Sequence, residues 1–316
     1  MSSSKLLYRL FGINPAETRV RRRGFEASDA AALARIETIG AAFVQGYHAA
    51  LQEPNLDRLA RRLDEIDIEL SGFAYEGAGM GLAVVDFVLP WRRGWQQFLD
   101  GPAAGHVYML HVGAGWAWVR LPLRPEAARR RLHPLYGWLA LDGYGFHQGY
   151  FDWRRYIELQ KLPANLSGYS RRAFDQGLGR ALWFVKGADP ANVAMAAAHF
   201  PPERRNDLWS GIGLAASYAG GASQEKLELL PQLAGEYTAQ LAQGAAFAAK
   251  ARQRAGNPAP HTKLACRLFC GLSADDAAKI TDNALIGLPA DDAELPAYEH
   301  WRRIVQNRFA RSAMQK

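Results

Sequence analysis

The stretch Arg172-Ala-Phe-Asp-Gln-Gly-Leu-Gly-Arg180 decides the fold, because its pair of glycines, two residues apart, recurs along the chain. Clear copies of the pair begin at Gly77, Gly113, Gly143, Gly177 and Gly211, and weaker copies begin at Gly46 and Gly244. The spacings between first glycines are 31, 36, 30, 34, 34 and 33 residues. Regular spacing of this length is typical of repeat proteins, in which each unit packs on its neighbours.

The repeated glycines are predicted to lie on helices, because strand alternation does not survive around them. Four positions after the first glycine, the residue is small in six of the seven units: Ala50, Gly81, Ala117, Ala181, Ala215 and Ala248. The exception is His147. Small residues four apart share one helix face and let neighbouring backbones approach closely. A helical glycine costs about 0.5–1 kcal/mol relative to alanine, so the repetition indicates such close packing. The glycines also lack the strand-turn-helix setting of a phosphate loop.

Partner helices are predicted between the marked ones. Residues 54–66 are amphipathic, Asp189 is placed to cap a helix over 190–200, and Ser223 to cap one over 224–233. One helix pair per roughly 33 residues predicts an all-α fold of about seven repeats, arranged as an α/α toroid or an α-solenoid. We expect a single domain over 1–316, with an N-terminal cap (1–27), repeats (28–256) and a C-terminal helical cap (257–316).

The composition is that of a globular protein, with 49% hydrophobic and 22% charged residues and a net charge of +7. We find no signal peptide and no membrane-spanning stretch, and we expect a cytoplasmic protein in which Cys266 and Cys270 are free thiols. Nucleic acid is not an expected partner, because no nucleic-acid-binding motif is present. The basic run over 19–23 is interpreted as a solvated surface or a docking surface.

The residue directly before the first glycine is polar in six of the seven units, on otherwise apolar helices: Gln45, Glu76, Asp142, Gln176, Ser210 and Gln243. The exception is Val112. If these helices line an inner wall, Glu76, Asp142 and Asp175 project toward a shared space. Carboxylates in an apolar cavity have raised pKa values and can protonate a substrate, so these three are candidate catalytic acids. The alternative is that they bond neighbouring backbone or cap adjacent turns.

His147 occupies the slot that is small in the other units, so it is a candidate catalytic base or orienting group at a cavity. The alternative is a core histidine satisfied by a hydrogen bond. Arg180 is five residues from Asp175, which does not favour a pair within one helix, and either side chain can instead reach another helix. An anionic group on a substrate is another candidate partner for Arg180.

Aromatic residues crowd the central units, and an excess of them on inner helices would suit a long apolar, unsaturated ligand. The candidate substrate-binding residues are His111, Trp116, Tyr144, Tyr150, Arg180 and Trp183. No His-x-x-x-His or Glu-x-x-His pattern occurs, so we expect no metal, and no cofactor is predicted. A serine hydrolase is not favoured, because no Gly-x-Ser-x-Gly motif is present.

Five stretches resemble a bacterial family of unknown function associated with enediyne polyketide and other natural-product gene clusters. They are Phe11-Gly-Ile-Asn-Pro-Ala-Glu17, Gly72-Phe-Ala-Tyr-Glu-Gly-Ala-Gly-Met-Gly81, Leu141-Asp-Gly-Tyr-Gly-Phe-His-Gln-Gly-Tyr-Phe151, Arg172 to Arg180 as quoted above, and Gln243-Gly-Ala-Ala-Phe-Ala-Ala-Lys-Ala-Arg252. The resemblance covers about residues 8–305. It implies a role in natural-product biosynthesis and names no reaction.

Together the cavity and the resemblance predict an enzyme of secondary metabolism acting on a long, hydrophobic polyene or isoprenoid-like substrate, by acid–base cyclisation or rearrangement. A helical toroid would enclose that substrate and exclude water. The alternative is a non-catalytic helical-repeat partner that binds a polyketide intermediate, a carrier protein or a biosynthetic complex. A single apolar cavity faced by Glu76, Asp142 and His147 would favour the enzyme.

Overall fold

The computed structural model describes residues 3–26 and 29–313, and within those ranges the chain is all-helical, without strands. Seventeen α-helices are joined by short 3-10 and π-helical turns in this part of the chain. The predicted all-α class is therefore confirmed. The predicted boundary between N-terminal cap and repeats, at residues 27 and 28, lies outside the described residues. Among the described helices, none has the length and apolar character needed to cross a bilayer.

Every first glycine of the marked pairs lies inside an α-helix, and each of these helices packs against the next one in chain order. The marked helices are α3 (Ala30–Gln52), α5 (Ile68–Val88), α7 (Val107–Arg120), α9 (Trp138–Phe151), α10 (Tyr169–Val185), α12 (Pro202–Ala219) and α14 (Thr238–Ala255).

The glycines are required because neighbouring backbones touch. A Cβ atom on Gly77 of α5 would stand 2.0 Å from the carbonyl oxygen of Phe43 on α3. On Gly115 of α7 it would stand 1.7 Å from the carbonyl oxygen of Ala140 on α9. No side chain fits at these separations, so the cost of a helical glycine is offset by close helix packing.

Neighbouring marked helices run in the same direction where the contacts define it. Gly77 of α5 faces Phe43 of α3, and Gly81, one turn later, faces Tyr47. Likewise Gly145 and Gly149 of α9 face successively later turns of α10. Since residue numbers rise together along each pair, the chain must return between marked helices through the partner segments.

The partner segments are short. They are α4 (Leu56–Asp64), α6 (Gly94–Asp100), α8 (Pro125–Arg129), a π-helical turn (Arg154–Glu158), α11 (Pro190–Ala198) and α13 (Gln224–Ala234). The caps predicted at Asp189 and Ser223 are confirmed, because their side chains accept hydrogen bonds from backbone amides of α11 and α13. The helix predicted over 54–66 begins two residues later, because Asn55 supplies the cap by accepting from the amide of Arg58.

Further helices flank the row at both ends of the chain. Before α3 come α1 (Ser3–Phe11), a 3-10 turn (Pro15–Thr18) and α2 (Val20–Arg23). After α14 come α15 (Pro260–Cys270), α16 (Ala274–Asn283) and α17 (Ala297–Ala313). Two further 3-10 turns, Ala104–His106 and Gly235–Tyr237, precede α7 and α14. Cys266 and Cys270 lie on α15 as free thiols, as predicted.

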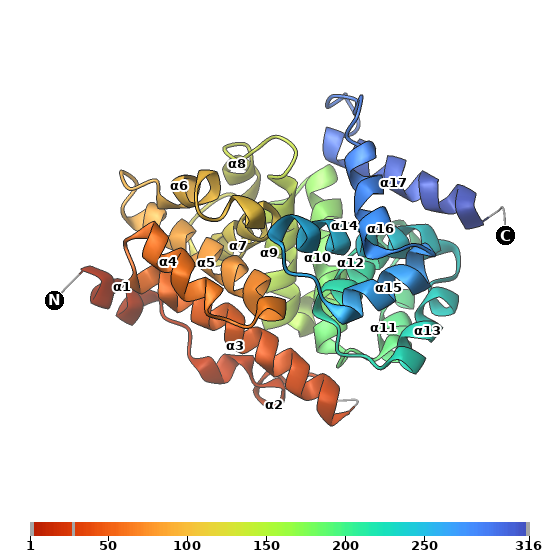
Figure 1. Cartoon of the computed structure of the whole chain (residues 1–316), viewed down its shortest axis with the longest axis horizontal. Coiled ribbons are helices and arrows are strands. Elements are labelled where there is room, and N and C mark those ends of the chain that lie inside the picture. Colours follow the sequence, from red (N-terminus) through yellow and green to blue (C-terminus); the bar gives the residue numbers. More distant parts are fainter. Residues whose placement is uncertain (1–2, 27–28, 314–316) are drawn as a thin grey trace.

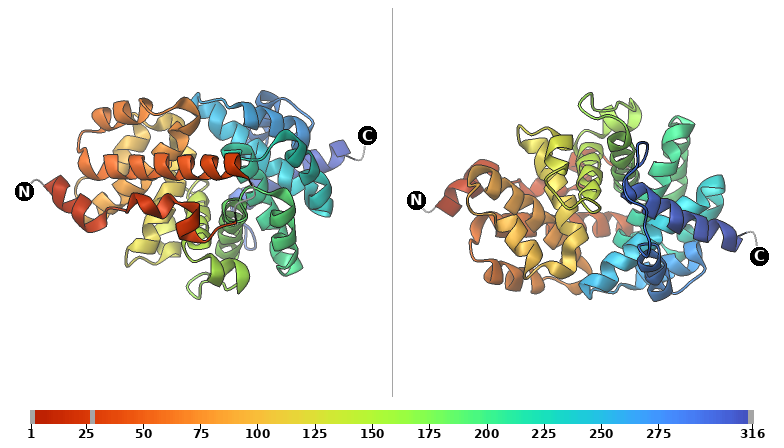
Figure 2. Two further views of the ribbon diagram at one scale, coloured as in Figure 1. Left: turned by 90° about the horizontal axis from the view of Figure 1, so that it is seen from below. Right: turned by 90° about the horizontal axis from the view of Figure 1, so that it is seen from above.

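The row of helices curves, with the N-terminal and C-terminal halves at opposite ends of the long axis (Figures 1 and 2). Its curvature brings the start of α3 to the end of α12, where Arg35 Nε donates to the carbonyl oxygen of Ala219 over 2.9 Å. Arg252 of α14 similarly donates to the carbonyl oxygen of Glu69 at the start of α5, over 3.2 Å. Helices far apart in the sequence therefore share one interior.

Candidate functional site

Glu76 is a buried acid without a hydrogen bond of normal length and angle. It lies on α5 directly before Gly77, with 1% of its surface exposed, and neither carboxylate oxygen has a hydrogen-bond partner. The nearest cation is Arg180 of α10, whose Nη2 lies 3.6 Å from Oε1. Burial raises the pKa of Glu76 to about 7, and the charge of Asp142 adds to the increase, whereas the charge of Arg180 and the nearby N–H groups of Trp116 and Arg180 lower it. At neutral pH the carboxyl group is therefore poised between its protonated and ionised forms.

Arg180 is shared between two carboxyl groups from two other helices. Its Nη1 donates to Oδ1 of Asp142 on α9 over 2.5 Å, while Nη2 faces Glu76. Gln176 Nε2 donates to the other oxygen of Asp142 over 2.8 Å and is itself in contact with the Tyr298 hydroxyl of α17 at 3.1 Å. Burial opposes the charge of Arg180, but the two carboxyl groups outweigh it and raise the pKa of the guanidinium. Arg180 is thus a permanent cation held beside Glu76.

Two small apolar cavities lie at this cluster. The Glu76 cavity has a volume of about 40 Å³ and is lined mainly by aliphatic and aromatic side chains: Ile13, Glu17, Thr18, Ile36, Ile39, Gly40, Phe43, Val44, Phe73, Glu76, Trp116, Phe146, Tyr150, Phe151 and Phe184. The Asp142 cavity has about 30 Å³ and is lined by Asp142, Arg180, Tyr108, Met109, Val112, Leu139, Leu214, Tyr218, Phe247, Ala248, Lys250, Ala251 and Trp301. The Glu76–Arg180–Asp142 cluster therefore contributes one carboxyl group to each cavity.

An N-terminal strap, residues 12–26, forms one wall of the Glu76 cavity. Arg23 fastens the strap, because its Nη2 donates to the carbonyl oxygen of Phe151 over 2.6 Å and its Nη1 lies 2.8 Å from a carboxylate oxygen of Glu17. The indole of Trp153 donates to the carbonyl oxygen of Arg23 over 2.9 Å. The basic run is thus partly used inside the protein, with Arg22 also on Glu17.

His147 lies beside the site without lining either cavity. Its ring makes an edge contact with Trp116 at 5.3 Å and lies 4.6 Å from the ring of Phe151. Burial, reinforced by Arg120 and Arg23, lowers the pKa of His147 to about 3. The imidazole is therefore neutral at neutral pH and packs behind the aromatic wall.

The structure brings some of the predicted substrate-binding residues to the site and separates others. Trp116 and Tyr150 line the Glu76 cavity, and Arg180 lines the Asp142 cavity. Trp183 is buried with its indole donating to the carbonyl oxygen of Gly220 over 2.8 Å, and Tyr144 contacts Gln148 and Phe174.

His111 belongs to another face. It lines a groove of about 600 Å³ with Trp95 and Tyr136, and burial lowers its pKa to about 4. Its Nδ1 lies 2.7 Å from the carbonyl oxygen of Val107, one turn earlier on α7. It therefore makes a local helix contact and lines neither cavity of the cluster.

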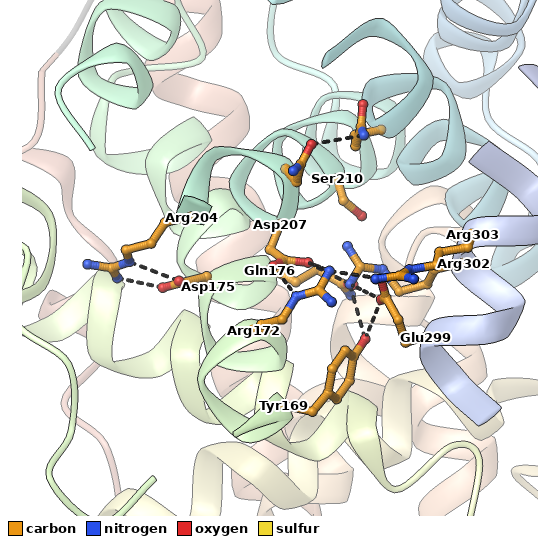
Figure 3. Close-up of polar contacts among 12 residues, drawn as sticks. Tyr169, Arg172, Asp175, Gln176, Arg204, Asp207, Ser210, Glu299, Arg302 and Arg303 are labelled. Carbon is orange, nitrogen blue, oxygen red and sulfur yellow. Dashed lines mark hydrogen bonds and ion pairs between the residues drawn. The ribbon is translucent and has the colours of Figure 1, made fainter. Parts of the chain in front are cut away.

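Asp175 pairs with Arg204 (Figure 3), whereas Glu76 and Asp142 pair with Arg180. Arg204 of α12 holds Asp175 with two hydrogen bonds, of 2.9 Å from Nε and 2.5 Å from Nη2. Burial raises the pKa of Asp175 to about 6, against the effect of Arg204. Its carboxylate faces a guanidinium and not a cavity.

The same view shows a buried network that sequence reasoning missed (Figure 3). Arg302 of α17 lies 2.7 Å from Asp207 of α12 and 3.0 Å from Glu299. Arg172 of α10 lies 2.9 Å from Asp207 and 2.8 Å from Glu299. The only signal for it in the sequence is the three-residue spacing of Glu299 and Arg302 on one helix face, since none of these residues occupies the repeated polar position. The network fastens α17 to the row.

A family model described as "Protein of unknown function (DUF1702)" matches residues 3–309, nearly the whole chain. No curated protein and no solved structure matches the sequence of this chain. The residues that the structure describes also contain no cluster of three or more histidine, cysteine or carboxylate side chains that could hold a metal ion.

Proposed function

The chain belongs to the DUF1702 family of proteins of unknown function. We propose that it is an acid–base isomerase or cyclase that acts on a hydrophobic, polyene-like substrate. The observation that carries the proposal is Glu76, a fully buried carboxyl group without a hydrogen bond of normal length and angle, at the wall of an aromatic cavity. The resemblance to a family associated with enediyne and other natural-product gene clusters supports a place in natural-product biosynthesis.

The proposed first step is proton transfer from the Glu76 carboxyl group to a carbon of the polyene. The π electrons of one double bond form the new C–H bond, and a delocalised cation remains on the substrate. A pKa near 7 keeps a large fraction of Glu76 protonated at neutral pH, as a general acid requires. The aromatic rings of Trp116 and Phe43, which line the cavity, favour a cation.

The second step returns the proton. The cation either loses a proton to the Glu76 carboxylate, which isomerises the polyene, or is first attacked by another double bond, which closes a ring. Both routes balance without a co-reactant. Arg180 stabilises the transient carboxylate from 3.6 Å, and Asp142 holds Arg180 in that position.

The size of the Glu76 cavity defines how the substrate would enter. A cavity of about 40 Å³ accommodates a few water molecules, not a long polyene. We propose that the strap moves away from α9 to admit the substrate and that the curved row forms the wall of an α/α toroid around the reacting end. The packing of the marked helices in chain order supports this arrangement.

The small cavity volume also favours a second candidate, a non-catalytic helical-repeat partner that binds a polyketide intermediate, a carrier protein or a biosynthetic complex. On that view the ion pairs of Asp142 and Asp175 are structural.

The deciding experiment is incubation of the purified chain with polyenes and isoprenoids in D₂O, followed by mass spectrometry. The enzyme is expected to place deuterium on carbon, and Glu76→Gln is expected to abolish incorporation because it removes the proton and keeps the side-chain shape. Glu126→Gln is a matched control, because Glu126 is a partly exposed carboxylate that accepts hydrogen bonds from Ser167, away from both cavities. No incorporation with any substrate, together with tight binding of a carrier protein, would instead support the partner.

A further inference from the structure

Exposed apolar side chains gather at one end of the molecule. Thirteen large hydrophobic residues are exposed in the described part of the chain, and six of them fall within residues 6–10 and 87–91: Leu6, Tyr8, Leu10, Phe87, Val88 and Trp91. Trp91 is 75% exposed and Leu10 is 64% exposed. Exposed apolar residues concentrated in two short segments favour an interaction surface.

The two segments lie at the same end of the structure. Tyr8 of α1 packs edge-on against His48 near the end of α3, at 4.7 Å. On α5, Gly81 packs against Ala50, two residues further along α3. The last turns of α3 therefore contact both α1 and α5, and Figure 1 shows α1 and the C-terminal ends of α3 and α5 at one end of the long axis.

Basic side chains surround these apolar residues. On α1, the exposed residues Lys5 and Arg9 are four residues apart and share one face of the helix. The exposed residues Leu6 and Leu10 have the same spacing and form the adjacent face. Arg92 and Arg93 follow Trp91 in the turn after α5. These residues, together with the six apolar ones, are called the end surface below.

The neighbouring carboxylates offset only part of this charge, because the charge of Asp86 attracts Arg92 and Glu53 pairs with Arg58 at 3.9 Å. Asp86 accepts hydrogen bonds from the amides of Gly94 and Trp95, both of 2.8 Å. Glu53 accepts from the amide of Asn55 over 2.9 Å. Lys5, Arg9 and Arg93 are exposed and make no ion pair among the described residues, so the end surface favours an anionic partner.

We propose that the end surface docks the protein on an anionic lipid bilayer. Leucine, tryptophan and phenylalanine side chains enter the boundary between headgroups and acyl chains, while lysine and arginine contact anionic headgroups. α1 continues directly into the strap over the Glu76 cavity, so a docked bilayer lies next to the segment that must move for a hydrophobic ligand to enter. The proposal itself does not depend on the chemistry proposed for Glu76.

The test is flotation of the full chain with vesicles of phosphatidylcholine alone and of phosphatidylcholine and phosphatidylglycerol in equal parts. The wild type is expected to bind the anionic vesicles on the order of tenfold more tightly and to dissociate at high salt. Replacing both bases of α1 (Lys5→Glu with Arg9→Glu), or three apolar residues (Leu6→Ser, Leu10→Ser and Trp91→Ser), is expected to weaken this binding on the order of tenfold or more.

The control replaces two exposed leucines of α13, Leu229→Ser and Leu233→Ser, which lie outside the end surface and should leave vesicle binding unchanged. Circular dichroism checks that all variants are folded. Failure of the wild type to bind anionic vesicles, or equal loss in the α13 control, would overturn the proposal. Self-association abolished by the three serine substitutions, without vesicle binding, would assign the end surface to a second copy of the chain and would also overturn it.

Discussion

At the scale of single residues, Glu76 should make stability depend on pH. Its pKa in the folded chain is about 7, against an ordinary value of 4.5. Because the folded state holds the proton more tightly, the stabilising contribution is complete below about pH 4.5 and is lost as the pH rises through about 7. The shift corresponds to roughly 3 kcal/mol.

Glu76→Gln removes this dependence. Between about pH 4.5 and pH 8, the free energy of unfolding of the variant should rise relative to that of the wild type by roughly 3 kcal/mol. Urea unfolding of both proteins across this range measures the difference, and other titrating groups cancel in the comparison. A constant difference across the range would show that Glu76 ionises normally.

His147 is expected to be structural. With its pKa lowered to about 3, it remains neutral and is a weak base. His147→Ala should lower the free energy of unfolding by roughly 2–4 kcal/mol through lost packing, and should leave turnover by the folded fraction and its pH profile unchanged. A shifted pH profile in the D₂O assay would restore the catalytic role predicted from the sequence.

At the scale of elements, the glycine contacts make a sharp prediction. A Cβ atom on Gly177 would stand 1.9 Å from the carbonyl oxygen of Asp142, so Gly177→Ala must push α9 and α10 apart. We expect a loss of about 3 kcal/mol or more. Gly94→Ala is the control, because a Cβ atom there meets its nearest neighbour at 3.4 Å, and it should stay within about 1 kcal/mol of the wild type. Equal effects of the two substitutions in urea unfolding would contradict this packing.

The fastening of α17 makes a second prediction at this scale. Arg302→Met leaves the buried carboxylates of Asp207 and Glu299 without one of their cations, which should cost roughly 3–5 kcal/mol. Arg303→Met removes the neighbouring ion pair to Glu299, but Arg303 is 51% exposed, so its loss should cost less than about 1 kcal/mol. Thermal unfolding distinguishes the two variants, and similar losses would show that the buried network does not stabilise the fold.

The sequence predicted the elements that obey local rules. Small residues four apart indicated the marked helices, and the side chains of Asp189 and Ser223 indicated two helix starts, because both signals act within one or two turns. Other features could not be predicted in this way. Nothing local shows that Arg204 would take Asp175 away from the other carboxylates, since the two residues meet only after α10 and α12 pack.

At the scale of the whole molecule, the curvature of the row creates the site. Glu76 and Arg180 come from α5 and α10, which are far apart in the chain, and they meet only because the intervening helices bend around a shared interior. The repeated polar position identified Glu76 and Asp142 from the sequence. It did not show that they would face two cavities on either side of Arg180, since that depends on the path of every helix between them.

The central claim is that this interior holds Glu76 as an acid that is half protonated at neutral pH. Carbon-13 NMR of the chain labelled at glutamate carboxyl carbons, with Glu76→Gln to assign the signal, measures its ionisation directly. The account predicts a midpoint near pH 7, moving downward in Asp142→Asn, because loss of the Asp142 charge leaves Arg180 free to stabilise the Glu76 carboxylate. A midpoint near the ordinary value of 4.5, unmoved by that substitution, would contradict the account.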